Sequence, residues 1–250
     1  MTAVLEAREL TRSFGAVKAA DHLNLCLEEG QIIGIVGPNG SGKTTFVNIV
    51  TGYVKPTQGQ ILFRGRDVTG RDPRELTKLG ITRSFQIPQL YTGLSILDNM
   101  LIALAIRAGQ HWQFWQPLKT PARVEAALRV LDRFGFSPDA ADRQVSALPE
   151  GGRKLLDVAL SIALEPQLLL LDEPTSGVSV DDKFEVMDAL IQVLKDARIT
   201  TVFIEHDMDV VERYADRVIV FADGAIMAEG RPESVLADAN VRRHLLGEGA

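Results

Sequence analysis

The chain has 250 residues, 46% of them hydrophobic, so it is long enough to bury one large core or two modest ones. Acidic residues outnumber basic ones by 33 to 27, and the net charge of −6 excludes a broad basic surface for nucleic acid. No apolar run reaches the roughly 18–20 residues that span a bilayer, and no secretory signal opens the chain, so we expect a cytoplasmic protein.

The N-terminal part is predicted to form short strands, because apolar and polar residues alternate between turns. The expected strands are residues 4–10, 22–27, 31–36 and 60–63. A helical pattern over about residues 43–50 ends at Gly52. Cys26 lies in an alternating stretch, where we expect a buried strand position, and as the only cysteine it forms no intrachain disulfide.

The middle of the chain, from about residue 90 to residue 163, changes to a helical pattern. Apolar residues recur there at helical spacing, at Val124, Leu128, Leu131 and Phe134. Three prolines divide the stretch into pieces: Pro117, Pro121 and Pro138. This region therefore predicts a helical subdomain inserted into the chain.

The C-terminal part returns to alternating strands and helices. Apolar strands are expected at 167–171 and 200–204, with an amphipathic helix between them whose apolar face runs from Phe184 to Leu194. Such a crossover predicts a parallel sheet and an α/β fold. Residues 217–222 and 225–228, joined by Asp-Gly, predict a hairpin at the edge of that sheet.

A glycine-rich segment follows the expected strand 31–36 and opens the next helix. It consists of Gly37, Pro38, Asn39, Gly40, Ser41, Gly42, Lys43, Thr44 and Thr45. Its glycines let backbone amides wrap around phosphates, the helix N-terminus adds a partial positive charge, and Lys43 adds a full one. The hydroxyl of Thr44 suits Mg²⁺. A glycine-rich turn can match by chance, but a strand before and a helix after are the context of a phosphate-binding loop, so the segment predicts a nucleoside triphosphate site.

Asp172 and Glu173 end the next buried strand, and strand ends of an α/β sheet are where ligands bind. Asp172 is expected to hold Mg²⁺ through its water, and Glu173, on the other face of the pleat, to polarise the water that attacks the γ-phosphate. The alternative is a strand capped by solvated acids. His206 ends the following strand at the same edge and could reach the γ-phosphate, although a lone histidine is more often structural.

With these motifs in this order, the chain resembles the nucleotide-binding subunits of ABC transporters over nearly its whole length. Gln86 matches the family's glutamine that senses Mg²⁺ and the attacking water, and Phe14 matches the aromatic residue that stacks on adenine, with an ordinary packed ring as the alternative. The resemblance implies a P-loop NTPase (RecA-like) core with an antiparallel β subdomain, residues 1–88 and 165–250. It implies a helical subdomain over residues 89–164.

Two segments depart from the family pattern. In the loop of residues 149–152, here called the signature-like loop, Pro149 stands where the family has a serine that contacts the γ-phosphate of ATP on the other subunit. The amides of Gly151 and Gly152 and the helix dipole could still face that phosphate. Ser179 stands where an aspartate is common at the dimer contact. Neither change touches Lys43, so hydrolysis is still expected.

Within the family, the chain is most similar to ATPase subunits of importers for branched-chain amino acids, urea and amides. Three stretches carry this similarity: 80–86, the extra segment of about 106–124, and the tail 228–247. Lipopolysaccharide-export ATPases have a similar tail and phosphate loop but lack the longer insertion, so they remain the alternative. Trp112 and Trp115 in the insertion are expected to pack within the subdomain rather than to contact a permease or bilayer.

The resemblance implies ATP and Mg²⁺ as cofactors and a homodimer, or a heterodimer with a second ABC ATPase. It implies transmembrane permease subunits, an extracytoplasmic solute-binding protein and no nucleic acid as partners, and a peripheral position on the cytoplasmic face of the inner membrane. A mechanoenzyme acting on DNA or ribosomes would need a coiled coil, a second cassette or a basic surface, and none is present in the sequence. A small-molecule kinase is disfavoured by Gln86 and His206, whereas a regulatory subunit with weak turnover stays open because of Pro149.

Overall fold

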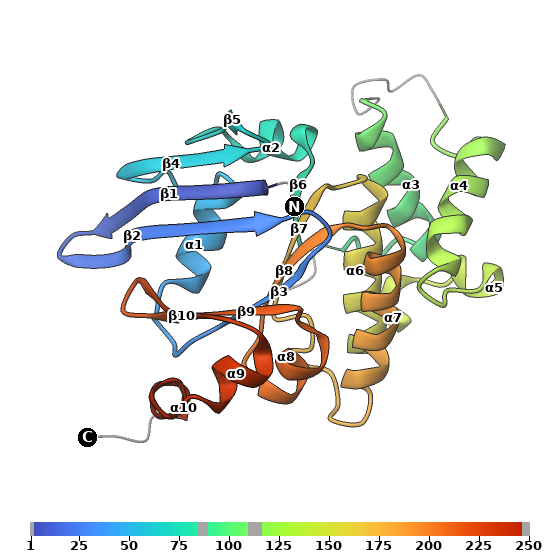
Figure 1. Cartoon of the computed structure of the whole chain (residues 1–250). Helices are drawn as coiled ribbons and strands as arrows, with labels where there is room; N and C mark the ends of the chain where they lie inside the picture. The colour runs from blue at the N-terminus through green and yellow to red at the C-terminus, as the bar shows by residue number, and fades with distance from the viewer. Residues whose placement is uncertain (1–2, 85–89, 110–116, 247–250) are drawn as a thin grey trace. The chain divides into compact units, whose positions relative to one another are not determined.

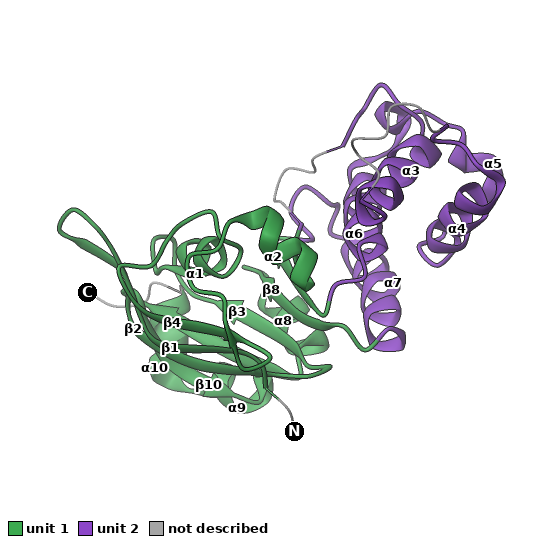
Figure 2. Cartoon of the chain, turned by 90° about the horizontal axis from the view of Figure 1, so that it is seen from above, with its two compact units in different colours: residues 1–83, 167–173, 198–250 green, residues 84–166, 174–197 purple. Residues whose placement is uncertain are grey.

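The computed structural model describes residues 3–84, 90–109 and 117–246 (Figure 1). The chain forms two compact units, which are coloured separately in Figure 2. The first holds residues 1–83, 167–173 and 198–250, and the second holds residues 84–166 and 174–197. The segment 89–164 that we expected to form the helical subdomain therefore lies in the second unit, which also contains residues 174–197.

The larger sheet of the first unit is mostly parallel, as the sequence predicted. Within the described residues, six strands follow the order β10-β9-β3-β8-β7-β6, and only β10 is antiparallel to its neighbour. Their bounds are β3 Ile32–Val36, β6 Ile81–Arg83, β7 Leu168–Asp172, β8 Thr200–Ile204, β9 Arg217–Ala222 and β10 Ala225–Gly230. The predicted hairpin is confirmed as β9 and β10 at the sheet edge. The strands β3, β7 and β8 are buried throughout, which explains their nearly continuous apolar sequences.

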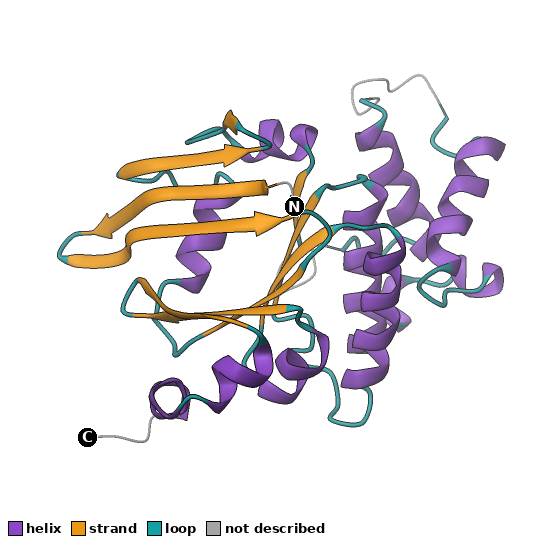
Figure 3. Cartoon of the chain, viewed as in Figure 1, coloured by secondary structure: helices purple, strands orange, loops and turns teal. Residues whose placement is uncertain are grey.

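The second sheet of the first unit is antiparallel, in the order β2-β1-β4-β5 (Figure 3). Its strands are β1 Ala3–Phe14, β2 Val17–Glu28, β4 Gln58–Phe63 and β5 Arg66–Asp67. The hairpin of β1 and β2 is longer than predicted, because register shifts let pairing continue past Glu9 and His22, which have φ of 50° and 49°.

Cys26 is exposed, so the prediction of a buried cysteine is wrong. Around Cys26 the buried positions of β2 are Leu23, Leu25 and Leu27. Because successive side chains of a strand point to opposite faces, Cys26 lies on the outer face. The alternation of buried and exposed residues is as predicted, but Cys26 lies on the exposed face of the strand and not on the buried one.

Short helices cover the sheets of the first unit. They are α1 Lys43–Val50, α2 Pro73–Leu79, α8 Met208–Tyr214, α9 Pro232–Ala237 and α10 Ala239–Leu246. The helix α1 buries Phe46, whose ring lies 5.7 Å from that of Phe221 on β9. Asp72 accepts hydrogen bonds from the amides of Arg74 and Glu75 and so fixes the start of α2.

The second unit is helical, as predicted for the middle of the chain. It contains α3 Ile96–Arg107, α4 Pro121–Asp132, α5 Pro138–Ala141, the 3₁₀ turn Val145–Ala147, α6 Glu150–Ala163 and α7 Lys183–Asp196. Side-chain oxygens of Ser95, Thr120 and Ser137 cap α3, α4 and α5. Of the helices that the structure describes in either unit, none has both the length and the apolar character to cross a bilayer.

Candidate functional site

The glycine-rich loop leaves β3 at Val36 and enters α1 at Lys43, as predicted. A Cβ on Gly37 would lie 2.3 Å from the carbonyl oxygen of Phe221, and one on Gly42 would lie 2.2 Å from that of Ala19. Both glycines also have positive φ, 152° and 103°. The loop is therefore pressed against the main chain on two sides, and only glycine fits these positions.

Lys43 is buried and folds back over its own loop. Its Nζ donates to the carbonyl oxygens of Gly37 at 2.7 Å and Pro38 at 2.9 Å. Burial lowers the pKa of Lys43, and the negative charges of Glu173 and Asp172 oppose that shift. The ammonium group is thus held at the loop by weak neutral partners, which phosphate oxygens can replace.

Two adjoining cavities bring most of the predicted site together. The first, of about 150 Å³, is lined by Asn39, Gly40, Ser41, Gly42, Lys43, Thr44, Thr45, Glu173, Ile204 and His206. The second, of about 360 Å³, shares Asn39 and His206 with the first. It is otherwise lined by Gly37, Pro38, Met208, His244 and Leu245. The glycine-rich loop, Glu173 and His206 therefore meet at one edge of the parallel sheet, whereas Asp172, the last residue of β7, lines neither cavity.

Glu173 and His206 contact each other directly, with 3.2 Å between His206 Nε2 and Glu173 Oε1. Glu173 has φ of 50°, an uncommon conformation for a non-glycine residue, and its amide donates to Ile204 O at 3.0 Å. The backbone thus turns sharply after β7 and joins Glu173 to the end of β8. This arrangement gives a carboxylate beside an imidazole in an open cavity.

Asp172 forms a buried ion pair that the sequence did not reveal. Its Oδ2 accepts from Arg83 Nη2 at 2.5 Å, and Arg83 Nη1 donates to Asn48 Oδ1 at 2.5 Å. Arg83 was identified from the sequence only as part of the stretch that resembles the importer ATPases. The feature that could have identified it is a charged residue at the end of a short strand.

The residues present fit a magnesium nucleotide. Ser41 Oγ in the loop is buried and has no hydrogen-bond partner among the described residues, so it is available to a phosphate oxygen. Thr44 and Asp172 offer the oxygen ligands that Mg²⁺ prefers. The first two peptide units of α1 and the positive-φ glycines supply donors for an anion. The donor set therefore suits phosphates from one side and a hard cation from the other.

Phe14 ends β1 and is 47% exposed, which is not the burial of an ordinary core ring. The guanidinium carbon of Arg12 lies 4.5 Å from the centre of the ring, and Arg12 Nη1 donates to Lys55 O at 3.1 Å. Phe14 is not among the residues that line the two cavities. Its predicted contact with adenine stays a prediction.

The signature-like loop belongs to the second unit and begins α6. Pro149 precedes the helix without a side-chain cap, so the first amides of α6, including those of Gly151 and Gly152, have no such acceptor. Ser179 Oγ donates to Asp182 Oδ2 at 2.7 Å and accepts from the Asp182 amide at 3.2 Å, just before α7. Gln86, Trp112 and Trp115 lie outside the described residues.

A glycine-rich loop between a buried strand and a helix, with an acidic pair ending a parallel strand of the same sheet, defines a P-loop nucleoside triphosphatase. Residues 20–176 match the family described as ABC transporter. The chain is 36% identical to the high-affinity branched-chain amino acid transport ATP-binding protein LivG of Escherichia coli K12, over 98% of both chains.

Solved structures of ABC transporter cassettes also resemble this chain. The ADP conformation of MJ1267, an ATP-binding cassette of an ABC transporter, matches with a TM-score of 0.86 and 30% identity over 99% of this chain and 100% of that one. The dimeric post-hydrolysis state of the cassette MJ0796 with ADP and Pi matches with a TM-score of 0.75 and 26% identity over 91% and 98%. The chain belongs to the ABC transporter family and is one of its ATP-hydrolysing subunits.

Proposed function

We propose that this subunit drives the import of branched-chain amino acids or related small solutes, using the P-loop edge of the parallel sheet to bind and hydrolyse ATP. The observation that carries the proposed chemistry is the meeting of Lys43, Glu173 and His206 at one cavity. The solute class follows from the likeness to LivG over nearly the full length of both chains. The whole-length match favours the importer branch over the lipopolysaccharide-export alternative.

ATP binding uses groups that the loop already presents. Amides of the loop, apart from that of Ser41, which donates to Pro38 O, and the hydroxyl of Ser41 donate to phosphate oxygens. Lys43 exchanges the carbonyls of Gly37 and Pro38 for the phosphates. Phe14 stacks on the adenine ring with its exposed face. Thr44 and Asp172 would hold Mg²⁺, which would neutralise charge on the phosphates.

Hydrolysis uses Glu173 and His206. Glu173 accepts a hydrogen bond from a water molecule and draws its proton away as the water oxygen bonds to the γ-phosphorus. The bond from that phosphorus to the bridging oxygen breaks, which leaves ADP and inorganic phosphate. His206 Nε2, 3.2 Å from Glu173 Oε1, orients the carboxylate, and after leaving it the same nitrogen can donate to a γ-phosphate oxygen. Gln86 is assigned to the same water by resemblance alone.

Two copies, or one copy and a related ATPase, enclose two ATP molecules in this proposal. Gly151 and Gly152 of one copy present their amides to the γ-phosphate on the other, and MJ0796 provides a precedent for a dimeric cassette. The partners are transmembrane permease subunits and an extracytoplasmic solute-binding protein, and the subunit lies on the cytoplasmic face of the membrane.

The test is Mg²⁺-dependent ATPase activity of the purified chain across protein concentration, with Lys43→Ala as the control. We expect activity that rises more than linearly with concentration, because each site needs a second copy, and that is lost in the control. ATP binding without turnover at any concentration would instead support a subunit that hydrolyses ATP only with its permease, or the regulatory alternative.

A further inference from the structure

Arg83 ends β6, and its guanidinium joins two parts of the nucleotide site. One nitrogen donates to Asp172 and the other to Asn48, each at 2.5 Å. The side chains of Arg83 and Asp172 are only 8% and 9% exposed. This contact is therefore a buried, charge-assisted bridge and not one of the weak ion pairs of a protein surface.

The bridge follows from the sheet order. β6 runs parallel to β7 with Arg83 opposite Leu170, two residues before Asp172. Asn48 lies on α1, the helix that begins with Lys43. A single side chain thus ties the acidic strand to the helix of the phosphate loop.

The geometry leaves half of the Asp172 carboxylate for another ligand. Arg83 holds Oδ2, and Oδ1 is the second oxygen of the same planar group. Because the guanidinium is itself anchored on Asn48, the position of Oδ2 is fixed relative to α1. A lysine ammonium has no planar fork and cannot hold both partners in the same way.

We propose that Arg83 is a positioning residue for the magnesium ion: it grips Oδ2 of Asp172 and braces on Asn48, so that Oδ1 is presented to the metal. This inference rests on the proposed nucleotide site. Arginine keeps its positive charge and repels a nearby cation. Its benefit to metal binding must therefore come from geometry, and replacements that keep the charge but lose the fork should be the most harmful.

The experiment measures metal affinity directly, by electron paramagnetic resonance titration of Mn²⁺ into the full chain with a non-hydrolysable ATP analogue. Arg83→Lys is expected to weaken Mn²⁺ binding about tenfold, the usual size for losing a partner that orients a metal ligand. Asn48→Ala, which removes only the brace, is expected to weaken it by about threefold. Affinity for the analogue in EDTA should change by less than about twofold in both variants.

Arg83→Met separates positioning from folding. It should lower the melting temperature more than Arg83→Lys does, because a buried carboxylate loses its counter-charge. It should nevertheless bind Mn²⁺ more tightly than Arg83→Lys, because the repelling charge is gone. If Arg83 had a purely structural role, Arg83→Met would be the more impaired variant in both melting temperature and Mn²⁺ affinity.

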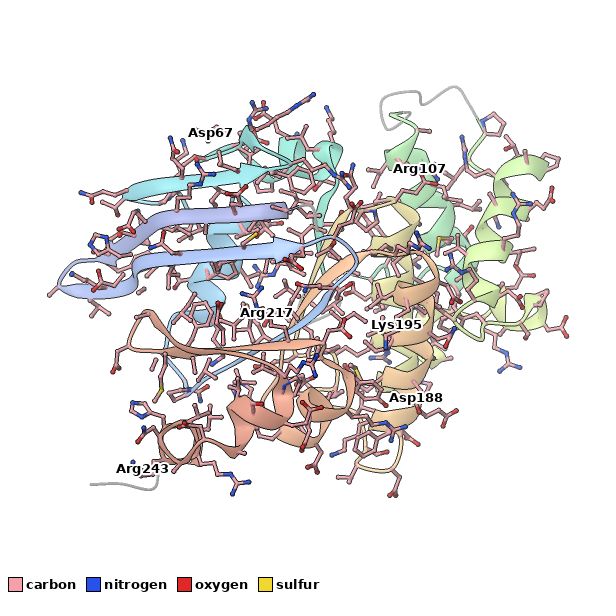
Figure 4. The ribbon with its side chains drawn as sticks, in the orientation of Figure 1. Asp67, Arg107, Asp188, Lys195, Arg217 and Arg243 are labelled. Atoms are coloured by element: carbon pink, nitrogen blue, oxygen red, sulfur yellow. The ribbon has the colours of Figure 1, made fainter. Side chains whose placement is uncertain are left out.

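The matched control is Arg217→Lys. Arg217, labelled in Figure 4, lies on β9 and also bridges two partners, Cys26 O at 2.9 Å and Glu229 Oε2 at 2.7 Å. Its partners lie on β2 and β10, and neither is on β7 or α1, so Mn²⁺ affinity should not change.

Unchanged Mn²⁺ affinity in Arg83→Lys and Asn48→Ala would overturn the inference, as would equal losses with and without metal. Failure of the unmodified chain to bind the analogue would be a different result. It would remove the proposed nucleotide site and, with it, the inference.

Discussion

The phosphate loop and the signature-like loop are both glycine-rich starts of helices, but they are held in different ways. In the phosphate loop, carbonyl oxygens lie 2.2–2.3 Å from where the Cβ of Gly42 or Gly37 would be. In the signature-like loop, a Cβ on Gly151 would meet side-chain methyl groups, of Val186 at 3.2 Å and of Val178 at 3.6 Å, and one on Gly152 would meet the side chain of Leu148 at 3.5 Å. Main-chain atoms cannot move aside to make room for a Cβ, whereas side chains can. The phosphate loop therefore requires glycine at these two positions, and the signature-like loop can accept other small residues.

The largest expected effect is on the chemistry at the phosphate-loop edge. Glu173→Gln should slow turnover by roughly 10² to 10⁴, the size expected for losing a general base, while ATP binding persists. Blocked hydrolysis should also trap a dimer. Single-turnover kinetics and size-exclusion chromatography with ATP check both, and normal turnover would remove Glu173 from its role.

A comparison of two glycines tests the main-chain constraint. Gly42 and Gly40 both have positive φ, 103° and 81°, but only Gly42 has a carbonyl in the way. Gly40→Ala should cost about 1–2 kcal/mol for the backbone conformation alone. Gly42→Ala should cost clearly more and should abolish ATP binding. Equal melting temperatures for the two variants would show that the carbonyl oxygen of Ala19 does not constrain Gly42.

In the second unit, the effects should be smaller. Ser179→Ala removes the hydroxyl that accepts from the Asp182 amide before α7, and should cost about 0.5–1 kcal/mol in unfolding free energy. Ser179→Asn supplies an accepting oxygen without placing a second carboxylate against Asp182, and should recover most of that loss. Urea denaturation measures both, and an asparagine as destabilising as alanine would rule out this role of the hydroxyl.

The smallest change is expected at the signature-like loop itself. Pro149→Ser adds a hydroxyl where backbone amides already suffice, so turnover should stay within about threefold of the original. A larger rise in ATPase activity would show that the natural loop is compromised. That result would favour the regulatory alternative.

Local motifs made much of the fold and the cavity predictable. The residues of the loop 37–45 are sufficient to predict its conformation. The parallel order of the strands then predicts that Glu173 and His206 lie at the same edge of the sheet, and the structure brings them into contact. Arg83 could not be identified in this way. Its partner Asp172 is 89 residues away, and they meet only because β6 pairs with β7.

Other errors came from within single strands. Alternation predicted the strand around Cys26 but not which face the cysteine takes, because neighbouring leucines compete for the same inward positions. The long hairpin of β1 and β2 escaped prediction because its bulges interrupt the two-residue period.

The two sheets of the first unit meet at the phosphate loop through main-chain atoms. The amide of Gly224 donates to Ser41 O at 3.0 Å, and the amide of Asp21 donates to Gly224 O at 2.8 Å. Because these hydrogen bonds join peptide groups, which all residues share, the connection places little demand on the side chains around it. It does require glycine at Gly37, Gly42 and Gly224, where a Cβ would meet main-chain oxygens at 2.2–2.6 Å.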